Sequence, residues 1–278
     1  MRYRLRKSRK GDEPELKNIW RICFGDSDEY INVFFEKIYI PGSAAVAETE
    51  EGHICSAMYT LEAGVSGGEK CGYLYALGTL PEYRGRGIGE AVTRKAAELG
   101  FDRGFDLCVT CPASKTLFDY YRGMGFEDFS RISVLEWNGD AIAENNAPGI
   151  MSISLDNYML FREKMLRDDY VKFGRDYMEF LQSSLEYAGG GFFLIEGDCI
   201  TVAEPDGDTG VRVRELLTEN KPPQKFMRLL AQHFCSSRVI AYVPEIQGTG
   251  NPHTLVMRKC GKMRDTSKLY NYFPFVFD

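Results

Sequence analysis

The sequence has no apolar run long enough to cross a lipid bilayer. Its longest apolar stretches, such as residues 73–77 and 192–195, fall far short of the roughly 20 residues that a membrane-spanning helix needs. It also lacks the low complexity and charge excess of disordered chains, since 44% of its residues are hydrophobic and 27% are charged. We therefore expect a folded protein with no membrane partner.

The first residues lack the apolar core of a secretory signal. Residues 1–11 are basic, but Asp12, Glu13 and Glu15 follow them where a signal peptide would become apolar. The 8 cysteines are spread over 278 residues, unlike those of a small disulfide-rich domain. We expect reduced thiols and a cytoplasmic location.

A strong charge of one sign is missing as well. The chain has 34 basic and 40 acidic side chains, a net charge of −6, which argues against a nucleic-acid partner and mildly favours cationic small molecules. The 3 histidines lie far apart in the sequence, and strand alternation would put Cys108 and Cys111 on opposite faces. We predict no metal site, and the sequence is compatible with a homo-oligomer.

What the chain does contain is a repeated order of helix and strand patterns. Residues 3–137 predict β-α-α-β-β-β-α-β-α-β, with an antiparallel meander over residues 44–80. Residues 138–149 are polar and typical of a linker. Residues 156–258 then repeat the order αα-βββ-α-β. The sequence thus predicts two domains, 1–140 and 150–278, which are either a degenerate duplication or independent domains of similar class.

One segment carries the main chemical signal. A strand pattern over residues 73–80 leads through Pro81 into Arg84-Gly85-Arg86-Gly87-Ile88-Gly89 and then into a helix. Glycines let successive backbone N–H groups approach an anion closely, and a helix N-terminus adds unpaired amides and the positive end of its dipole. The even glycine spacing does not match G-x-G-x-x-G, and there is no G-K-[ST] of a P-loop.

This loop resembles motif A of the GNAT superfamily of acetyl-CoA-dependent N-acyltransferases, whose signature is [QR]-x-x-G-x-[GA]. A second family motif, Y-x-x-x-G-F, matches residues 121–126. The resemblance covers about residues 1–137 and implies an α/β (α+β) fold, a mixed and mostly antiparallel sheet flanked by helices. The second half looks like a degenerate further copy, because its corresponding loop, residues 218–223, has two prolines and no glycine.

The resemblance also implies an activity and its residues. The chain would transfer an acetyl group from acetyl-CoA, its cosubstrate, to a primary amine of a small molecule or peptide by direct attack in a ternary complex. The Leu77 amide would stabilise the oxyanion, the backbones of Leu77 and Thr79 would pair with pantetheine, and Tyr121 would protonate the leaving thiolate. Ser114 stands where many members have a cofactor-contacting Asn. The CoA pyrophosphate would be held by the amides of Arg84, Gly85, Arg86, Gly87, Ile88 and Gly89.

The family's usual proton acceptor is missing. Many relatives have a glutamate six positions before the residue that matches Thr79, and this chain has Tyr73 there. The candidates are Glu62, Glu69, a water relay, or a group from the second half. We hypothesise that Asp278, through its side chain or terminal carboxylate, reaches the first domain's site, as in two-domain relatives of the enhanced-survival type. The alternative is that the aromatic tail, residues 270–277, is an ordinary final strand.

Two other functions stay open. The missing glutamate is compatible with a non-catalytic acyl-CoA-binding pseudoenzyme or sensor, and a tandem fold is compatible with an aminoacyl- or long-acyl transferase. The acceptor would be chosen by residues 24–41, residues 64–70 and the second half. Four acidic residues in the first of these segments either attract a cation or form a solvated helix face: Asp26, Asp28, Glu29 and Glu36.

Overall fold

The first half follows the element order that the sequence predicts, with one short 3₁₀ turn added. The computed structural model describes residues 2–140, 149–166, 170–219, 221–246, 250–260 and 272–275. The elements of the first half are β1 (Tyr3–Lys7), α1 (Glu13–Phe24), α2 (Asp28–Lys37), β2 (Ala44–Thr49), β3 (Ile54–Ser66), β4 (Glu69–Thr79), η1 (Pro81–Tyr83), α3 (Ile88–Asp102), β5 (Leu107–Thr110), α4 (Lys115–Gly123) and β6 (Glu127–Asn138).

The second half repeats the predicted order and adds two short strands, β7 and β8. Strands of two or three residues are too short to leave a periodic signal in the sequence. Its elements are β7 (Ile150–Ser152), α5 (Leu155–Met165), β8 (Lys172–Phe173), α6 (Arg175–Tyr187), β9 (Gly191–Ile195), β10 (Cys199–Asp206), β11 (Gly210–Thr218), α7 (Pro223–His233), β12 (Arg238–Pro244) and β13 (Asn251–Arg258). Among the described residues, no helix has both the length and the apolar character to span a bilayer.

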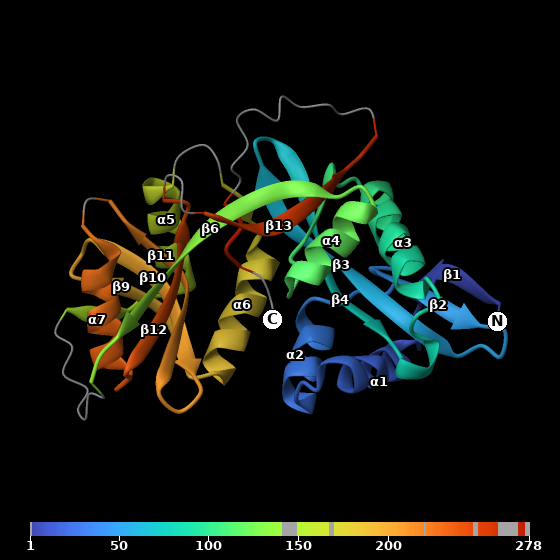
Figure 1. Ribbon diagram of the computed structural model, residues 1–278, viewed down its shortest axis with the longest axis horizontal. Helices are drawn as coiled ribbons and strands as arrows, with labels where there is room; N and C mark the ends of the chain where they lie inside the picture. The colour runs from blue at the N-terminus through green and yellow to red at the C-terminus, as the bar shows by residue number, and fades with distance from the viewer. Residues whose placement is uncertain are drawn as a thin grey trace.

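The two halves share one sheet because they exchange strands. Its order is β1-β2-β3-β4-β5-β13-β6-β12-β11-β10-β9-β7, and β8 pairs with β3 outside this path. β13, from the second half, lies between β5 and β6, whereas β6, from the first half, pairs with β12 on its other side. Figure 1 shows β6 and β13 running together from one half to the other.

This exchange is a feature that the sequence patterns do not predict. Each half contributes its last strand to the part of the sheet that the other half forms. A boundary near residues 138–149 of the sequence therefore does not correspond to a single boundary in the sheet. Residues 141–148 of the predicted linker lie outside the described residues. The domain boundaries therefore remain a prediction about the chain.

The pairing inside each half is otherwise the same. β3 and β4 form an antiparallel pair and β4 and β5 a parallel one, just as β10 and β11 are antiparallel and β11 and β12 parallel. The fold is a mixed, mostly antiparallel sheet flanked by helices, as predicted, and its two halves are arranged as a tandem.

Three hydrophobic clusters hold the layers together. α3 and α4 cover one face of β2 to β5, and α7 covers the matching face of the second half. On the opposite face, α1, α2, α5, α6 and residues 272–275 share a single core. Within it the rings of Phe34 (α2) and Phe180 (α6) lie 5.7 Å apart. This shared core packs the two halves against each other.

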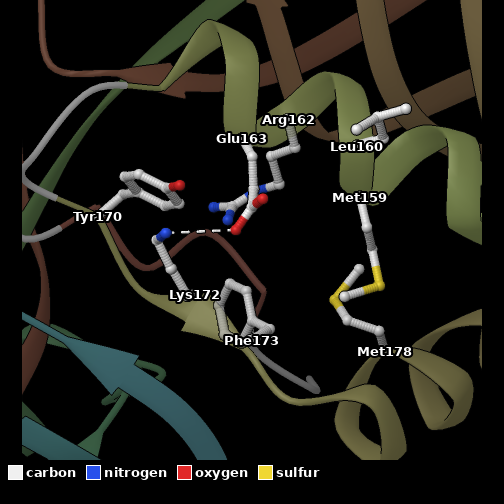
Figure 2. A pocket seen from close by; sticks show the side chains of 8 residues that line it. All are labelled: Met159, Leu160, Arg162, Glu163, Tyr170, Lys172, Phe173 and Met178. Atoms are coloured by element: carbon white, nitrogen blue, oxygen red, sulfur yellow. Dashed lines mark ion pairs between the residues drawn. The ribbon is translucent and has the colours of Figure 1, made fainter. Parts of the chain in front are cut away.

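A buried ion pair fixes the end of the described chain in this core. Arg162 of α5 lies 2.9 Å from Glu215 of β11, and the Tyr158 hydroxyl donates to the same carboxylate. The Arg162 guanidinium also lies 5.2 Å from the Phe173 ring and 5.4 Å from that of Phe275. Figure 2 shows Arg162 beside Phe173 in a cavity of about 200 Å³.

A second ionic cluster joins the first two strands. Glu48 of β2 is 1% exposed and accepts hydrogen bonds from Arg4 and, at 2.8 Å, from Arg6. Arg6 also donates to Asp12, before α1, at 2.6 Å. The hydrogen bonds from Arg6 and Arg4 lower the pKa of Glu48 from 4.5 to about 2.

The Glu48→Gln variant should lose stability in a pH-dependent way. Because the folded pKa lies below the unfolded one, the contribution of Glu48 is complete above about pH 4.5 and is lost as the pH falls toward 2. Breaking a buried pair costs about 3 kcal/mol, so urea unfolding at pH 7 should show a loss of that order. The two proteins should converge near pH 2. Glu50→Gln, an exposed neighbour, should change little, and a loss that is equal at both pH values would refute this account.

Candidate active site

A cleft opens where β4 and β5 separate. Their parallel pairing runs from Cys71 opposite Leu107 to Tyr73 opposite Val109. Beyond it β4 bulges, because Ala76 has a φ of 51° and the register with β3 shifts there. The resulting cavity has a volume of about 320 Å³. It is lined by Trp20, Phe24, Asp26, Met58, Tyr73, Leu74, Tyr75, Ala76, Leu77, Thr110, Cys111, Pro112, Ala113, Leu117 and Tyr121.

The glycine loop lies between the end of β4 and the start of α3. Gly85 and Gly87 have φ values of 72° and 74°, the left-handed region that favours glycine. A Cβ at either position would meet nothing within 4 Å, so the space beside the loop is open. Arg84 donates from Nε to the Thr79 carbonyl at 2.8 Å, and Arg86 donates to the Glu82 carbonyl at 3.0 Å. Both arginines therefore brace the exposed loop.

The start of α3 suits an anion. The first backbone hydrogen bond of this helix runs from the Ala91 amide to the Gly87 carbonyl. The amides of Ile88, Gly89 and Glu90 belong to the first turn, whose N–H groups have no acceptor within the helix. Together with the helix dipole and the open glycine loop, they fit a pyrophosphate group.

Leu77 and Thr79 occupy different places on β4. Leu77 lines the cleft and falls between Tyr75 and Gly78, where the register of β4 with β3 shifts. The Thr79 carbonyl already accepts from Arg84 and from the Cys23 thiol at 3.5 Å, and its hydroxyl lies 2.8 Å from that of Ser56. The pantetheine contacts of both residues remain predictions.

The structure separates the two adjacent tyrosines of α4. Tyr121 is 5% exposed and lines the cleft, and burial raises the pKa of its hydroxyl to about 12 despite a hydrogen bond with Thr110. Tyr120 is 36% exposed, and its hydroxyl would lie 3.3 Å from a Cβ at Gly89. Tyr121 therefore faces the cleft with a proton to donate, whereas Tyr120 packs against the glycine loop.

These features agree with the family comparison. Residues 4–129 match the family model described as "Acetyltransferase (GNAT) domain". The first half is thus a GNAT acetyltransferase domain. The sequence has no significant match among curated proteins.

Solved structures extend the likeness in fold to the whole chain. A GCN5-related N-acetyltransferase from Anabaena variabilis is 20% identical, with a TM-score of 0.67, and the alignment covers 92% of this chain and 72% of that one. A probable N-acyltransferase from Enterococcus faecalis is 12% identical, with a TM-score of 0.64 and coverage of 93% and 73%. A tandem GNAT protein from the clavulanic acid biosynthesis pathway is 11% identical, with a TM-score of 0.54 and coverage of 92% and 98%.

Ser114 has a structural position in the GNAT domain. It is the N-cap of α4, and its hydroxyl accepts a hydrogen bond from the Leu117 amide at 3.4 Å. Ser114 is exposed, whereas Leu117 lines the cleft. The contact of Ser114 with the cofactor remains a prediction.

Two of the predicted proton acceptors lie away from the cleft. Glu62 is exposed on β3, and Glu69 forms an ion pair with Arg258 of β13 at 3.3 Å. Neither lines the cavity, and their role as proton acceptors remains a prediction. Tyr73, which stands where the family has its glutamate, does line it. Asp278 lies outside the described residues.

Asp26, one of the four acidic residues that the sequence offered either as a group that attracts a cation or as part of a solvated helix face, brings a carboxylate to the cleft. Gly25, with a φ of 76°, ends α1 and turns the chain so that Asp26 accepts a hydrogen bond from the Trp20 indole at 2.7 Å. Of the described residues that line this cavity, Asp26 is the only acidic one. The signal in the sequence was the position of Asp26 just after α1. Its acidic neighbours Asp28, Glu29 and Glu36 made a solvated helix face the alternative interpretation.

Cys108 and Cys111 pack on opposite faces of the sheet, as the strand alternation predicts. Cys108 is buried under α3, and burial raises its pKa to about 12. The Cys111 thiol donates to the His253 carbonyl of β13 at 3.2 Å on the other side. Within the part of the chain that is described, no cluster of three or more metal-ligating side chains occurs.

The second half has no counterpart of the glycine loop. α7 follows Pro222, whose φ is −65°, and begins at Pro223, so two N–H donors are missing at its start. The start of α7 therefore offers fewer free N–H groups to an anion than the start of α3 does.

Gly87→Ala should destabilise the protein through its backbone alone. A Cβ there meets no neighbour, but the left-handed conformation costs a non-glycine residue about 1 kcal/mol. Urea unfolding should show that loss. The control is Gly123→Ala, which should cause no loss of stability because Gly123 lies at the end of α4 with open space around it. Equal stabilities of the two variants would contradict the view that the left-handed backbone at Gly87 causes the loss.

Proposed function

We propose that the GNAT domain transfers an acetyl group from acetyl-CoA to a primary amine of a small molecule or peptide, by direct attack in a ternary complex. The observation that carries this proposal is the cleft, where Leu77 of β4 and Tyr121 of α4 line one cavity beside the glycine loop. The GNAT fold supports acyl transfer in general; the choice of acetyl donor and amine acceptor is our proposal.

The chain's own residues fit the donor. The amides at the start of α3 and in the loop would bind its pyrophosphate, and the open space beside Gly85 and Gly87 admits it. Acetyl-CoA, when bound, supplies a thioester carbonyl that an amine can attack.

Three groups in the cleft then carry the reaction. The Leu77 amide, where the register of β4 with β3 shifts, stabilises the negative charge on the carbonyl oxygen as the N–C bond forms. Asp26 holds the amine and takes its proton, directly or through water. Tyr121, kept protonated by burial, donates its proton to the sulfur as the C–S bond breaks, and regains one from solvent.

Tyr121→Phe should lower kcat by about 10² to 10⁴, because it removes the proton donor and keeps the ring. The KM for the amine should change little. Steady-state release of free thiol measures both constants. Tyr120→Phe, which removes the hydroxyl near Gly89 and keeps the ring, serves as the matched control and should stay within about twofold of the unaltered protein. Equal losses in the two variants would argue against Tyr121 as the acid.

Asp26→Asn should raise the KM for the amine and lower kcat by about 10² or more, while acetyl-CoA binding, measured by calorimetry, stays unchanged. Asp28→Asn is the control, since Asp28 is exposed at the start of α2 and pairs with Arg21. Asp278→Asn tests the side chain of the other proposed acceptor, since it leaves the terminal carboxylate in place. An Asp26→Asn protein with full turnover would exclude Asp26 from the reaction.

The decisive experiment compares binding with turnover. Acetyl-CoA is offered with polyamines, aminoglycosides, amino acids and peptides, and thiol release is followed. Acetylation of any of these amines supports the proposal. Tight CoA binding without turnover would favour the pseudoenzyme. The presence of Tyr73 where the family has a glutamate is the observation that supports this alternative. Turnover with a long-chain acyl-CoA alone would favour the long-acyl transferase.

A further inference from the structure

The part of the cleft that α1 contributes is aromatic. Trp20 and Phe24 of α1 and Tyr75 of β4 all line the cavity. The centroid of the Trp20 ring lies 5.5 Å from that of Tyr75 and 6.0 Å from that of Phe24, and both contacts are edge-to-face. The reaction proposed above gives these rings no role.

Phe24 is the exposed member of this aromatic wall. α1 buries one face, formed by Leu16, Ile19 and Trp20, and Phe24 follows Trp20 by four residues on the same face. Trp20 is 1% exposed, whereas Phe24 is 45% exposed and still lines the cavity. A single exposed aromatic residue is ordinary on a protein surface. This one, however, extends the apolar face of a helix into the lining of a site.

Asp26 lies next to this wall. Its Oδ2 accepts a hydrogen bond from the Trp20 indole at 2.7 Å, and within the described ranges this is the only hydrogen bond to Asp26. The second carboxylate oxygen, Oδ1, is therefore left for an amine. Trp20 joins the two features, because its N–H orients the carboxylate while its ring packs against Phe24 and Tyr75.

The charges of the lining do not suit an acceptor that carries a carboxylate. Asp26 is the one acidic residue among the described residues of the lining, and no Arg, Lys or His is found with it. Arg212 and Arg214 line a second cavity, of about 370 Å³, which shares residues 111–113 with the cleft as a wall. A carboxylate in the cleft would thus meet Asp26 with no cation of the lining to pair with, and like charges repel.

A second ammonium group on the acceptor is the competing possibility. The face of an aromatic ring attracts a cation, so the rings could bind it. At a partly exposed site, however, this attraction is smaller than the cost of taking the second ammonium out of water, and Asp26 pairs with only one cation. An aromatic ring on the acceptor has no such cost, and it buries apolar surface against Phe24.

We propose that the cleft selects an arylalkylamine, a primary amine that a short apolar chain joins to an aromatic ring, and that Phe24 is the residue that selects the ring. This inference rests on the acetyl transfer proposed above. The amine lies at Oδ1 of Asp26, and the ring of the acceptor packs against Phe24 and covers its exposed surface. Ring pairs of this kind gain free energy beyond the area that they bury.

Four acceptors test the proposal with the full chain and acetyl-CoA. Compared with 2-phenylethylamine, ethylamine lacks the ring, phenylalanine adds a carboxylate, and 1,4-diaminobutane has a second ammonium in place of the ring. We expect kcat/KM for 2-phenylethylamine to be at least about tenfold higher than for each of the other three. A value for 1,4-diaminobutane or phenylalanine that equals or exceeds it would overturn the proposal.

Phe24→Ala should raise the KM for 2-phenylethylamine about tenfold and leave that for ethylamine within about twofold. Phe24→Leu keeps apolar packing against Trp20 and removes the ring, so it should change the KM in the same direction even if Phe24→Ala does not fold. Ile22→Ala is the matched control, because Ile22 is 49% exposed on α1 and does not line the cavity. An equal loss with both amines in the Phe24 variants would overturn the proposal.

Calorimetry of 2-phenylethylamine with the CoA-loaded protein separates this inference from the acetyl transfer. Binding that weakens in Phe24→Ala, without turnover of any amine, would support the ring site and overturn the acetyl transfer. Turnover of amines with no preference for the ring would overturn this inference alone.

Discussion

The exchange of β6 and β13 is the constraint on which the rest of this structure depends. Backbone hydrogen bonds join β5 to β13, β13 to β6 and β6 to β12, so the two halves are parts of one sheet. Two domains that are joined only by a linker can move relative to each other. Strands of one sheet resist such movement, because it would break several backbone hydrogen bonds at once. The exchange therefore fixes the position of the second half relative to the cleft.

That placement brings the second half, which has no glycine loop, against a wall of the cleft. β13 carries His253 to a position beside Cys111, whose thiol donates to the His253 carbonyl. The segment after β5 thereby becomes a wall shared by two cavities. The chemistry of the two sides differs: tyrosines and Asp26 line one, and arginines line the other. The two halves pair the corresponding strands in the same way and line the neighbouring cavities with different side chains.

Burial determines which of several similar residues serves the cleft. Tyr120 and Tyr121 are adjacent and chemically identical, yet Tyr121 is buried in the lining of the cleft, whereas Tyr120 is more exposed and has its hydroxyl near Gly89. Asp26 and Asp28 differ in the same way, because Gly25 and the Trp20 indole bring only the first to the cleft. In each case the neighbouring elements, more than the residue type, decide the role.

The sequence alone determined the order of the elements and the glycines of the loop before α3, and the choice of Tyr121 came from the resemblance of residues 121–126 to a family motif. The first two depend on local physics: helical and strand periodicity and the positive φ that glycine adopts without strain. The strand exchange, the place of Asp26 in the lining of the cleft and the position of Glu62 and Glu69 away from it were decided only by the tertiary structure. Pairing between β6 and β12 joins residues about a hundred positions apart through backbone groups that are the same in every residue, so no side-chain pattern encodes the partner.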